Sequence, residues 1–231
     1  MPQRLLLLTG SFEAGVLIPF FARHAPAARI EAIHQGAELE AAVRAGTEGT
    51  RLLGFCTATI VPPALLALLP GPSYNIHPGP PSFPGRHPEC WGAYRAAPRF
   101  GATLHEMASR VDEGPIVDVQ WFEMTEGGGQ AAYGMRAYQA AIQLLMRWAP
   151  WLVNDDRPLP RSADRWSGTK TRRADIEAMC RVTPDIDEAE FERRRLAFAE
   201  QPGGRMSIML HGREFKYEVP PEAPPSPVEK T

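Results

Sequence analysis

Short apolar runs alternate with amphipathic segments along the first 120 residues of the chain. The apolar runs predict strands, which we place at residues 5–8, 29–34, 51–57 and 71–77. Apolar residues at helical spacing predict helices at residues 37–45 and 62–70. The run at 51–57 is almost continuously apolar, which is typical of a parallel strand covered on both faces. The alternation therefore predicts an α/β fold of the Rossmann-like, doubly wound type, with a mostly parallel sheet.

The second half of the chain predicts one long helix followed by a small α+β appendage. We expect the helix to run from Ala131 to Trp148, closed by Pro150, with a core face formed by Met135, Tyr138, Ile142, Leu145 and Met146. A linker at residues 154–160, a helix opened at Thr183 and a hairpin around His211 and Gly212 follow. The expected units are a main domain at residues 1–153, a helix-plus-hairpin subdomain at 154–217 and a Pro-rich, disordered tail at 218–231.

Composition and charge narrow the class of protein without naming a function. Hydrophobic residues make up 44% of the 231 residues and charged residues 23%, which allows a sizeable core. The formal net charge of −2 gives no support for a nucleic-acid surface. Cys56, Cys90 and Cys180 lie far apart without CxxC spacing, so we expect reduced thiols and a cytoplasmic protein. The apolar run after Arg4 is short and ends in turn residues, so we expect neither a secretory signal nor a membrane span.

Residues that can carry chemistry concentrate between Asn75 and Gln120. If the preceding strand continues through His77, Asn75 and His77 project from the same face, because side chains alternate along a strand. A carboxamide beside an imidazole suits the stabilisation of an oxyanion. Asp112 lies in a tight Asp-Glu-Gly-Pro turn, where a carboxylate can orient a water, hold an imidazole protonated or accept an amine proton. Taken alone, Asn75 and His77 are more simply interpreted as a polar pair bonded to local backbone at a strand end, and Asp112 as part of an ordinary turn. Together the three residues suit acyl transfer to a nucleophile supplied by the substrate.

The order and spacing of this stretch resemble a known family. Asn75-Ile-His77-Pro, a Pro-rich loop, Trp91, the Gly-Ala-Thr-x-His run ending at His105 and the Val-Asp112-x-Gly-Pro-Ile-Val run are similar to the signature of the folate-dependent formyltransferases, nearest to the branch that acts on methionyl-tRNA and nucleotide sugars. The resemblance implies transfer of a formyl group from 10-formyltetrahydrofolate, a cosubstrate, to a primary amine. It also implies catalytic roles for Asn75, His77 and Asp112 and a supporting role for His105.

The resemblance further implies a pterin pocket lined largely by two backbone segments. In this chain the segments fall on Thr59, Ile60 and Val61 and on Ala108, Ser109, Arg110 and Val111. The loop after His77 departs from the family, and we expect Ser82 and Arg86 to do the family's jobs from shifted positions or to face another acceptor. The Gly10–Gly15 turn carries an acidic residue that would repel a phosphate, so we interpret it as a simple strand–helix turn.

Several alternatives stay open at this point. Cys90 and His87 lie close in sequence, but no third ligand stands at metal spacing and no group orients a thiolate, so no metal site is expected. A hydrolase in which Asp112 activates water, and a non-catalytic Rossmann-type binding module, are rivals to the transferase.

Residues 161–217 carry twelve Lys and Arg against ten Asp and Glu, which is a small positive excess for a tRNA-binding face. The expected acceptor is therefore a small-molecule amine such as a nucleotide-linked amino sugar, and the hairpin offers an edge through which two copies can pair as a homodimer.

Overall fold

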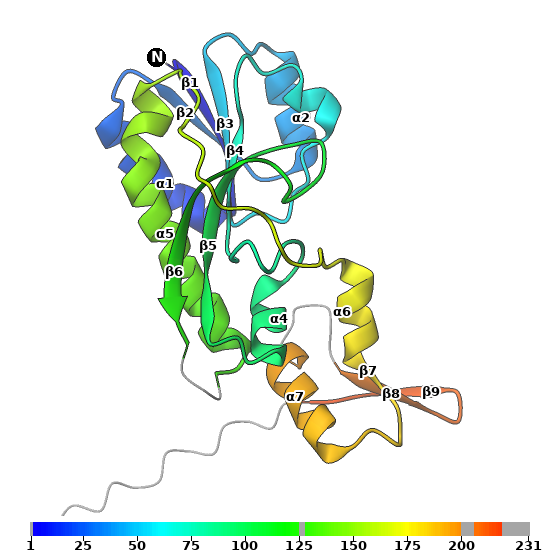
Figure 1. The fold of residues 1–231 in the computed structure, drawn as a ribbon. Coiled ribbons are helices and arrows are strands. Elements are labelled where there is room, and N and C mark those ends of the chain that lie inside the picture. The colour runs from blue at the N-terminus through cyan, green and yellow to red at the C-terminus, as the bar shows by residue number, and fades with distance from the viewer. Residues whose placement is uncertain (1, 125–127, 200–205, 219–231) are drawn as a thin grey trace, which may run out of the picture.

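The computed structural model describes residues 2–124, 128–199 and 206–218 of the chain. Its main body is a six-stranded sheet with the order β2-β1-β3-β4-β5-β6 (Figure 1). The strands are β1 (Arg4–Leu8), β2 (Arg29–Ile33), β3 (Thr50–Phe55), β4 (Tyr74–His77), β5 (Arg99–Glu106) and β6 (Ile116–Glu123). The pairs from β2 to β4 are parallel, whereas β5 is antiparallel to both β4 and β6. The predicted fold class, a mostly parallel Rossmann-like sheet, is confirmed.

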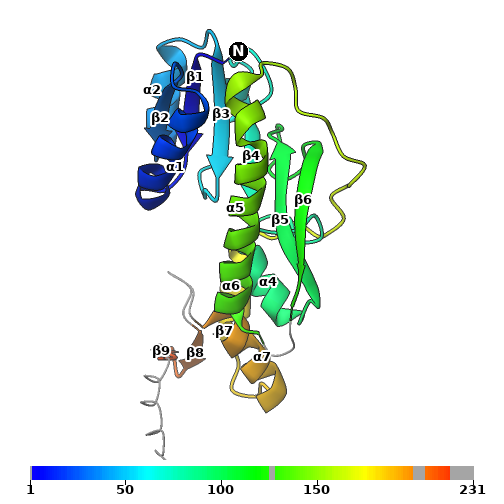
Figure 2. The ribbon, with the colours of Figure 1, turned by 90° about the vertical axis from the view of Figure 1, so that its left-hand side faces the viewer.

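Helices cover both faces of this sheet. They are α1 (Ser11–His24), α2 (Gly36–Arg44), α3 (Pro63–Leu66) and α5 (Gln130–Asn154). Leu5 and Leu7 of β1 belong to the core formed with α1 and α5, and Figure 2 shows α5 running along the length of the sheet. Leu6 and Leu8 point the other way, into the core formed with α2 and α3. Alternate leucines of one buried strand thus serve two cores, as expected for a strand covered on both faces.

The prediction that Pro150 closes the long helix is wrong, because α5 continues to Asn154. Proline removes one amide donor from a helix, a loss that is tolerated when packing holds the turn that follows. Here Leu152 is fully buried, and the guanidinium of Arg51 donates to the carbonyl oxygens of Trp151 and Leu152. The last turn of α5 is therefore held by contacts from outside the helix.

The predicted core face of α5 is also partly wrong. Leu145 is buried, and Tyr138 and Ile142 pack against the core, but Met135 and Met146 are 65% and 58% exposed. The face that packs on the sheet is instead rich in alanine, with buried Tyr133, Ala137, Ala140, Ala141, Leu144, Leu145 and Ala149. The angular position of a residue on the helix, and not its bulk, decides which side is buried.

The C-terminal part forms a small α+β unit at one end of the molecule (Figure 1). Its elements are α6 (Arg173–Cys180), β7 (Arg181–Val182), α7 (Glu188–Phe198), β8 (Ser207–Leu210) and β9 (Arg213–Lys216). The hairpin predicted around His211 and Gly212 is confirmed, and β7 pairs in parallel with β8. α4 (Pro88–Tyr94) joins this unit to the sheet, because Cys90 and Trp91 pack against Phe198.

Residues 155–172 connect α5 to this unit without a helix or a regular strand. The tail expected at 218–231 lies, apart from Glu218, outside the described residues, and the division into domains stays a prediction. None of the helices in the described ranges has the length and apolar character that a membrane crossing requires.

Candidate active site

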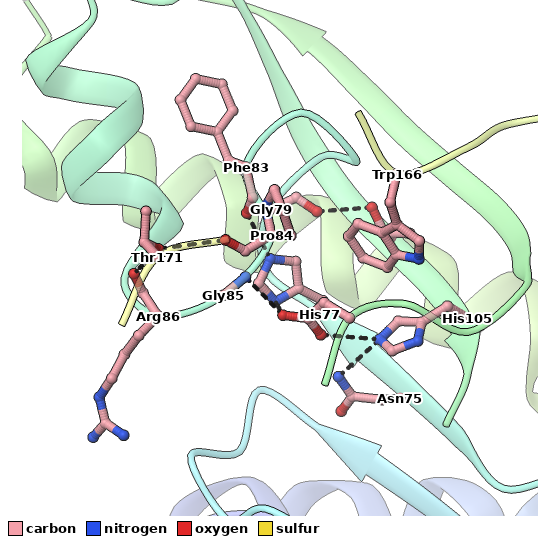
Figure 3. A network of polar contacts seen from close by, with 12 residues as sticks. Asn75, His77, Gly79, Phe83, Pro84, Gly85, Arg86, His105, Trp166 and Thr171 are labelled. Atoms are coloured by element: carbon pink, nitrogen blue, oxygen red, sulfur yellow. Dashed lines mark hydrogen bonds and ion pairs between the residues drawn. The ribbon is translucent and has the colours of Figure 1, made fainter. Parts of the chain in front are cut away.

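Asn75 and His77 lie on the same face of β4, at the carboxyl end of that strand. The alternate residues Tyr74 and Ile76 point into the core, so strand geometry turns the two polar side chains the other way. His77 is only 5% exposed. Its Nε2 lies 3.1 Å from the carbonyl oxygen of Phe83, so we assign a proton to Nε2, which donates to that oxygen. The strand thus presents a carboxamide and an imidazole side by side (Figure 3).

Asp112 comes from the tight turn between β5 and β6. Its backbone is left-handed (φ 49°), a conformation that aspartate tolerates better than most residues with a Cβ. A Cβ on Gly114 would lie 1.9 Å from the carbonyl oxygen of Glu106, so the turn needs a glycine at that position. The Asp-Glu-Gly-Pro sequence therefore builds a turn that directs a carboxylate toward the end of β4.

The Asp112 carboxylate is buried among two imidazoles and a backbone amide. Its Oδ2 lies 3.7 Å from His77 Nδ1 and accepts the Gly85 N–H at 2.8 Å, while its Oδ1 lies 3.4 Å from His105 Nε2. Burial by itself would raise the pKa of this carboxyl, but the two histidines and the Gly85 amide outweigh burial and hold the pKa well below its usual range. Asp112 is therefore ionised, and both of its oxygens are engaged.

His105 lies on β5 directly opposite Asn75 of β4. Its Nδ1 is 2.8 Å from the carbonyl oxygen of Glu106, and its Nε2 is 3.2 Å from Asn75 Nδ2. Nε2 therefore lies between the Asn75 amide and Asp112 Oδ1, which is 3.4 Å away, and joins these two side chains. His105 thus orients Asn75, and its supporting role in catalysis stays a prediction.

Residues 161–172, for which the sequence predicted no role at the site, cross over the cluster of Asn75, His77, His105 and Asp112. Within this segment, the Trp166 ring meets those of His105 and His77 in T-shaped contacts, with ring centroids 5.0 and 5.9 Å apart (Figure 3). The Trp166 Nε1–H donates to the carbonyl oxygen of Gly114 at 2.8 Å. We call residues 161–172 the strap. Its only sequence signal was a single tryptophan in a polar stretch without periodicity.

The strap also binds the loop that follows β4. Thr171 donates its N–H to the Pro84 carbonyl and accepts the Arg86 N–H, so it forms an isolated parallel bridge with Gly85 (Figure 3). Gly85 has a left-handed backbone (φ 97°), and a Cβ there would lie 2.3 Å from the Thr171 carbonyl oxygen. Only glycine fits this close approach. The strap therefore ties the turn that carries Asp112 to the loop whose Gly85 amide binds it.

A cavity of about 790 Å³ opens beside these residues, at the carboxyl edge of the parallel strands. It is lined by Asn75, His77, Asp112 and Arg86, and by six residues predicted for the pterin pocket, Thr59, Ile60, Val61, Ala108, Arg110 and Val111. Ser82, His105 and Ser109 are not among the lining residues. The predicted catalytic and cofactor-binding residues thus meet in one cavity of the size that takes a cofactor, while their individual roles stay predictions.

The sequence profile of the formyl transferase family matches residues 32–148, just over half of the 231 residues. The chain belongs to the formyl transferase family. It is an enzyme that transfers formyl groups, so the non-catalytic binding module is set aside. The matched range contains Asn75, His77 and Asp112 but ends before the strap.

Solved structures of several formyl transferases and related proteins share this fold. A sugar N-formyltransferase from Shewanella sp FDAARGOS_354 is 15% identical, with a TM-score of 0.75 over 95% of this chain and 98% of that chain. A methionyl-tRNA formyltransferase from Clostridium thermocellum is 13% identical, with a TM-score of 0.65 over 95% and 92%. HypX from Aquifex aeolicus, in complex with tetrahydrofolic acid, is 18% identical, with a TM-score of 0.57 over 93% of this chain and 37% of that chain. At these identities the likeness establishes the fold and leaves the acceptor open.

Cations line part of the cavity in this formyl transferase. They are Arg86, Arg110, Lys170, Arg172 and Arg173. Three of the five form ion pairs with glutamates. The guanidinium groups of Arg86 and Arg172 pair with no carboxylate among the residues that the structure describes, so they are available to an anionic ligand.

His87, Glu89 and Cys90 form a second polar cluster at the start of α4. The prediction that no third group accompanies Cys90 and His87 is wrong, because Glu89 places its carboxylate within 4.8 Å of both. His87 Nδ1 is 3.1 Å from Glu89 Oε1, and the Cys90 thiol donates to the same oxygen at 3.7 Å. Burial, together with Glu89, raises the pKa of the Cys90 thiol and disfavours the thiolate that a nucleophile needs. The cluster is a hydrogen-bonded group in which His87 and Glu89 face the cavity.

Proposed function

We propose that this enzyme transfers the formyl group of 10-formyltetrahydrofolate to the primary amine of a small molecule, in particular an amino sugar attached to a nucleotide. The observation that carries the proposal is the meeting of Asn75, His77 and Asp112 at one cavity of about 790 Å³. The amine itself attacks the formyl carbon, so the enzyme needs no nucleophile. The protein must orient the two substrates, stabilise the oxyanion that forms and accept protons.

Asn75 and His77 are the groups suited to stabilise the oxyanion. Asn75 lines the cavity with its amide group beside His105 Nε2, and an N–H of that amide can donate to the formyl oxygen. His77 donates from Nε2 to the carbonyl oxygen of Phe83 and would exchange that partner for the formyl oxygen as it becomes negative. Asp112, beside Nδ1 of His77, favours the protonated ring that such donation requires.

The formyl donor fits the apolar wall of the cavity. Ile60, Val61 and Val111 line it, and they belong to the two segments that the family uses for the pterin. A flat heterocycle with donors and acceptors on its edge is suited to apolar contact on its faces and backbone hydrogen bonds on its rim. The tetrahydrofolic acid complex of HypX, which shares the fold, supports a folate donor here.

The acceptor is the less constrained part of the proposal. Arg86 and Arg172 supply two guanidinium groups at the same cavity that pair with no carboxylate of a described residue, which suits the diphosphate of a nucleotide. The fold shared with a sugar N-formyltransferase over nearly the full length of both chains points the same way. A tRNA acceptor would call for a broad basic surface, and the net charge of the chain is −2.

The first test is calorimetric titration with a stable reduced-folate analogue, followed by a transfer assay with nucleotide-linked amino sugars. Wild type is expected to bind the analogue at one site and to form the N-formyl product. Asn75→Ala should keep analogue binding yet lose about 3 kcal/mol of transition-state stabilisation, roughly a hundredfold in rate. Asn154→Ala removes a carboxamide that bonds to the His24 carbonyl, and this matched control should turn over normally.

Two results would contradict the proposal. Release of formate at the full rate without an acceptor would favour the hydrolase. Normal turnover in Asn75→Ala would remove the oxyanion role from this residue and with it the assignment of the site.

A further inference from the structure

The proposed reaction must dispose of a proton that the buried cluster is poorly placed to take. A primary amine is largely an ammonium ion at neutral pH, and its nitrogen cannot attack until one proton has left. Asp112 is the carboxylate of the buried cluster, yet it is 4% exposed, accepts the Gly85 N–H and lies between two histidines. A carboxylate so strongly held in its ionised form is a weak base.

His77 is no better placed to accept the proton. Its Nε2 donates to the Phe83 carbonyl and its Nδ1 faces Asp112, so both ring nitrogens are engaged. In the proposed mechanism His77 also carries a proton while the oxyanion forms. The base must therefore be another group in the cavity.

His87 meets the requirements for that base. It lines the same cavity, and its side chain is 30% exposed against 7% for His77. Its Nδ1 is hydrogen-bonded to Glu89 at 3.1 Å, and no described residue forms a hydrogen bond with its Nε2. Because the Glu89 carboxylate accepts the Nδ1 proton, the lone pair on Nε2 is free to accept another.

The chain holds the His87 ring in an unusual backbone conformation. Its angles are left-handed (φ 55°, ψ 55°), which is uncommon for a residue with a Cβ. The conformation is fixed on one side by the Arg86 N–H, which donates to Thr171, and on the other by buried Pro88 and Cys90. Such strained and anchored residues are found preferentially at functional positions.

Charged groups from each element around the cavity face the same space as His87. They are Arg86, Glu89, Arg110, Asp112, Glu113, Lys170, Arg172 and Arg173. The five cations outnumber the three carboxylates. This balance disfavours an ammonium ion in the cavity and so assists loss of its proton.

We propose that His87, oriented by Glu89, is the general base that deprotonates the acceptor ammonium, an inference that rests on the proposed function. One proton passes from the ammonium to His87 Nε2, and the amine nitrogen then bonds to the formyl carbon. As the bond from that carbon to the folate nitrogen breaks, the second proton of the attacking nitrogen passes to the folate nitrogen. The products are the formamide, tetrahydrofolate and one proton, which His87 releases to solvent.

The decisive experiment compares kcat/KM for the amine in wild type and His87→Gln across pH. We expect roughly a hundredfold loss near pH 7, typical of removing a general base, shrinking to less than about tenfold near pH 9, where more of the amine is neutral. Imidazole added to His87→Ala should restore part of the activity. His24→Gln changes an exposed histidine at the end of α1 and should match wild type.

Two further variants separate proton removal from other defects. Asn75→Ala should lose the same factor at both pH values, because oxyanion stabilisation does not depend on the charge of the amine. Glu89→Gln keeps the ring and removes the carboxylate, so a smaller loss of about tenfold is expected.

The proposal is overturned if His87→Gln equals wild type near pH 7, or if its loss neither changes with pH nor responds to imidazole. Activity that is abolished by chelation and restored by Zn²⁺ would also overturn it, because a metal held by His87, Glu89 and Cys90 would occupy the ring. A wild-type enzyme that formylates no amine at any pH would refute the proposed function instead, so the two failures are distinguishable.

Discussion

Two pairings of histidine with carboxylate face one cavity in this formyl transferase, and they are built in opposite ways. Asp112 is buried between His77 and His105 and also accepts a backbone amide. Glu89 binds a single histidine, His87, whose ring is 30% exposed and has one nitrogen without a described partner. The same residue types thus form one cluster whose charge is fixed and one pair that can exchange a proton.

The difference follows from the chain segments that close over each carboxylate. Trp166 of the strap packs on the buried cluster, and the loop bound by the strap supplies the amide that fixes Asp112. His87 and Glu89 are only two residues apart, so their contact is local, and the strap reaches them through the bond from the Arg86 N–H to Thr171. Long-range contacts bury the Asp112 cluster and keep its carboxylate ionised, whereas the local pair leaves a group that can exchange protons with a ligand.

Asp112→Asn, which removes the charge of the buried cluster, should have the largest effect on formyl transfer. The amide cannot balance the neighbouring imidazoles, and removing one partner of a buried charged group costs roughly 3–5 kcal/mol. We expect formyl transfer to fall by about a thousandfold or more, beyond the loss in His87→Gln. Asp118→Asn, which alters a carboxylate that pairs with Arg147 on the outside of β6, should stay near wild type. A smaller loss in Asp112→Asn than in His87→Gln would show that the buried cluster is not the catalytic centre.

Trp166→Ala should open the buried cluster without removing any of its charged groups. The Gly114 carbonyl loses its donor and water reaches the histidines, so kcat should fall by roughly tenfold to a hundredfold. Trp166→Phe keeps a ring over the histidines and should recover most of the rate. Trp151→Ala removes the same side chain from a half-exposed position on α5 and serves as the control. Wild-type kcat in Trp166→Ala would mean that the strap plays no part in the catalytic arrangement.

The smallest expected effect concerns stability in acid. Burial opposes ionisation of Asp112, but its histidines and the Gly85 amide keep the pKa below the value of about 3.9 for an unfolded chain. A carboxyl with a lowered folded pKa stabilises the protein above the unfolded pKa and loses that contribution as the pH falls toward the folded pKa. The difference in unfolding free energy between wild type and Asp112→Asn should therefore shrink below about pH 4. Urea unfolding at about pH 6 and about pH 3.5 measures it, and a difference that grows in acid would contradict the assignment.

The four parallel strands β1 to β4 could be predicted because each carries its own apolar signal, whereas β5 and β6 were not predicted as strands. Residues 5–8 and 52–55 contain no polar side chain, and both runs lie in buried strands. The errors in α5 arise where a distant residue decides the outcome. Pro150 obeys a local rule for helix ends, but Arg51, 100 residues from Trp151 in sequence, holds the turn that follows. No window of the sequence contains both.

The residues of the candidate site also fall into those that could be predicted from the sequence and those that could not. Strand alternation and turn chemistry made Asn75, His77 and Asp112 candidates, and they could be named because the order and spacing of the whole stretch resemble the formyltransferase family. Glu89 follows His87 by two residues, but the sequence does not predict the left-handed backbone at His87 that sets the direction of its ring. Trp166 reaches the site through a segment without regular structure, so neither periodicity nor a turn signal pointed to it.

The bridge between Gly85 and Thr171 has a consequence for synthesis of the enzyme. Every strand of the six-stranded sheet is complete once β6 ends at Glu123, and the helix that covers it ends at Asn154. Thr171 lies 85 residues beyond Arg86, whose amide it binds. Because domains fold as units while the chain leaves the ribosome, the sheet can form before the strap has been made. A nascent chain halted there would be folded yet catalytically incomplete, so the enzyme acquires its activity only after the strap has been synthesised.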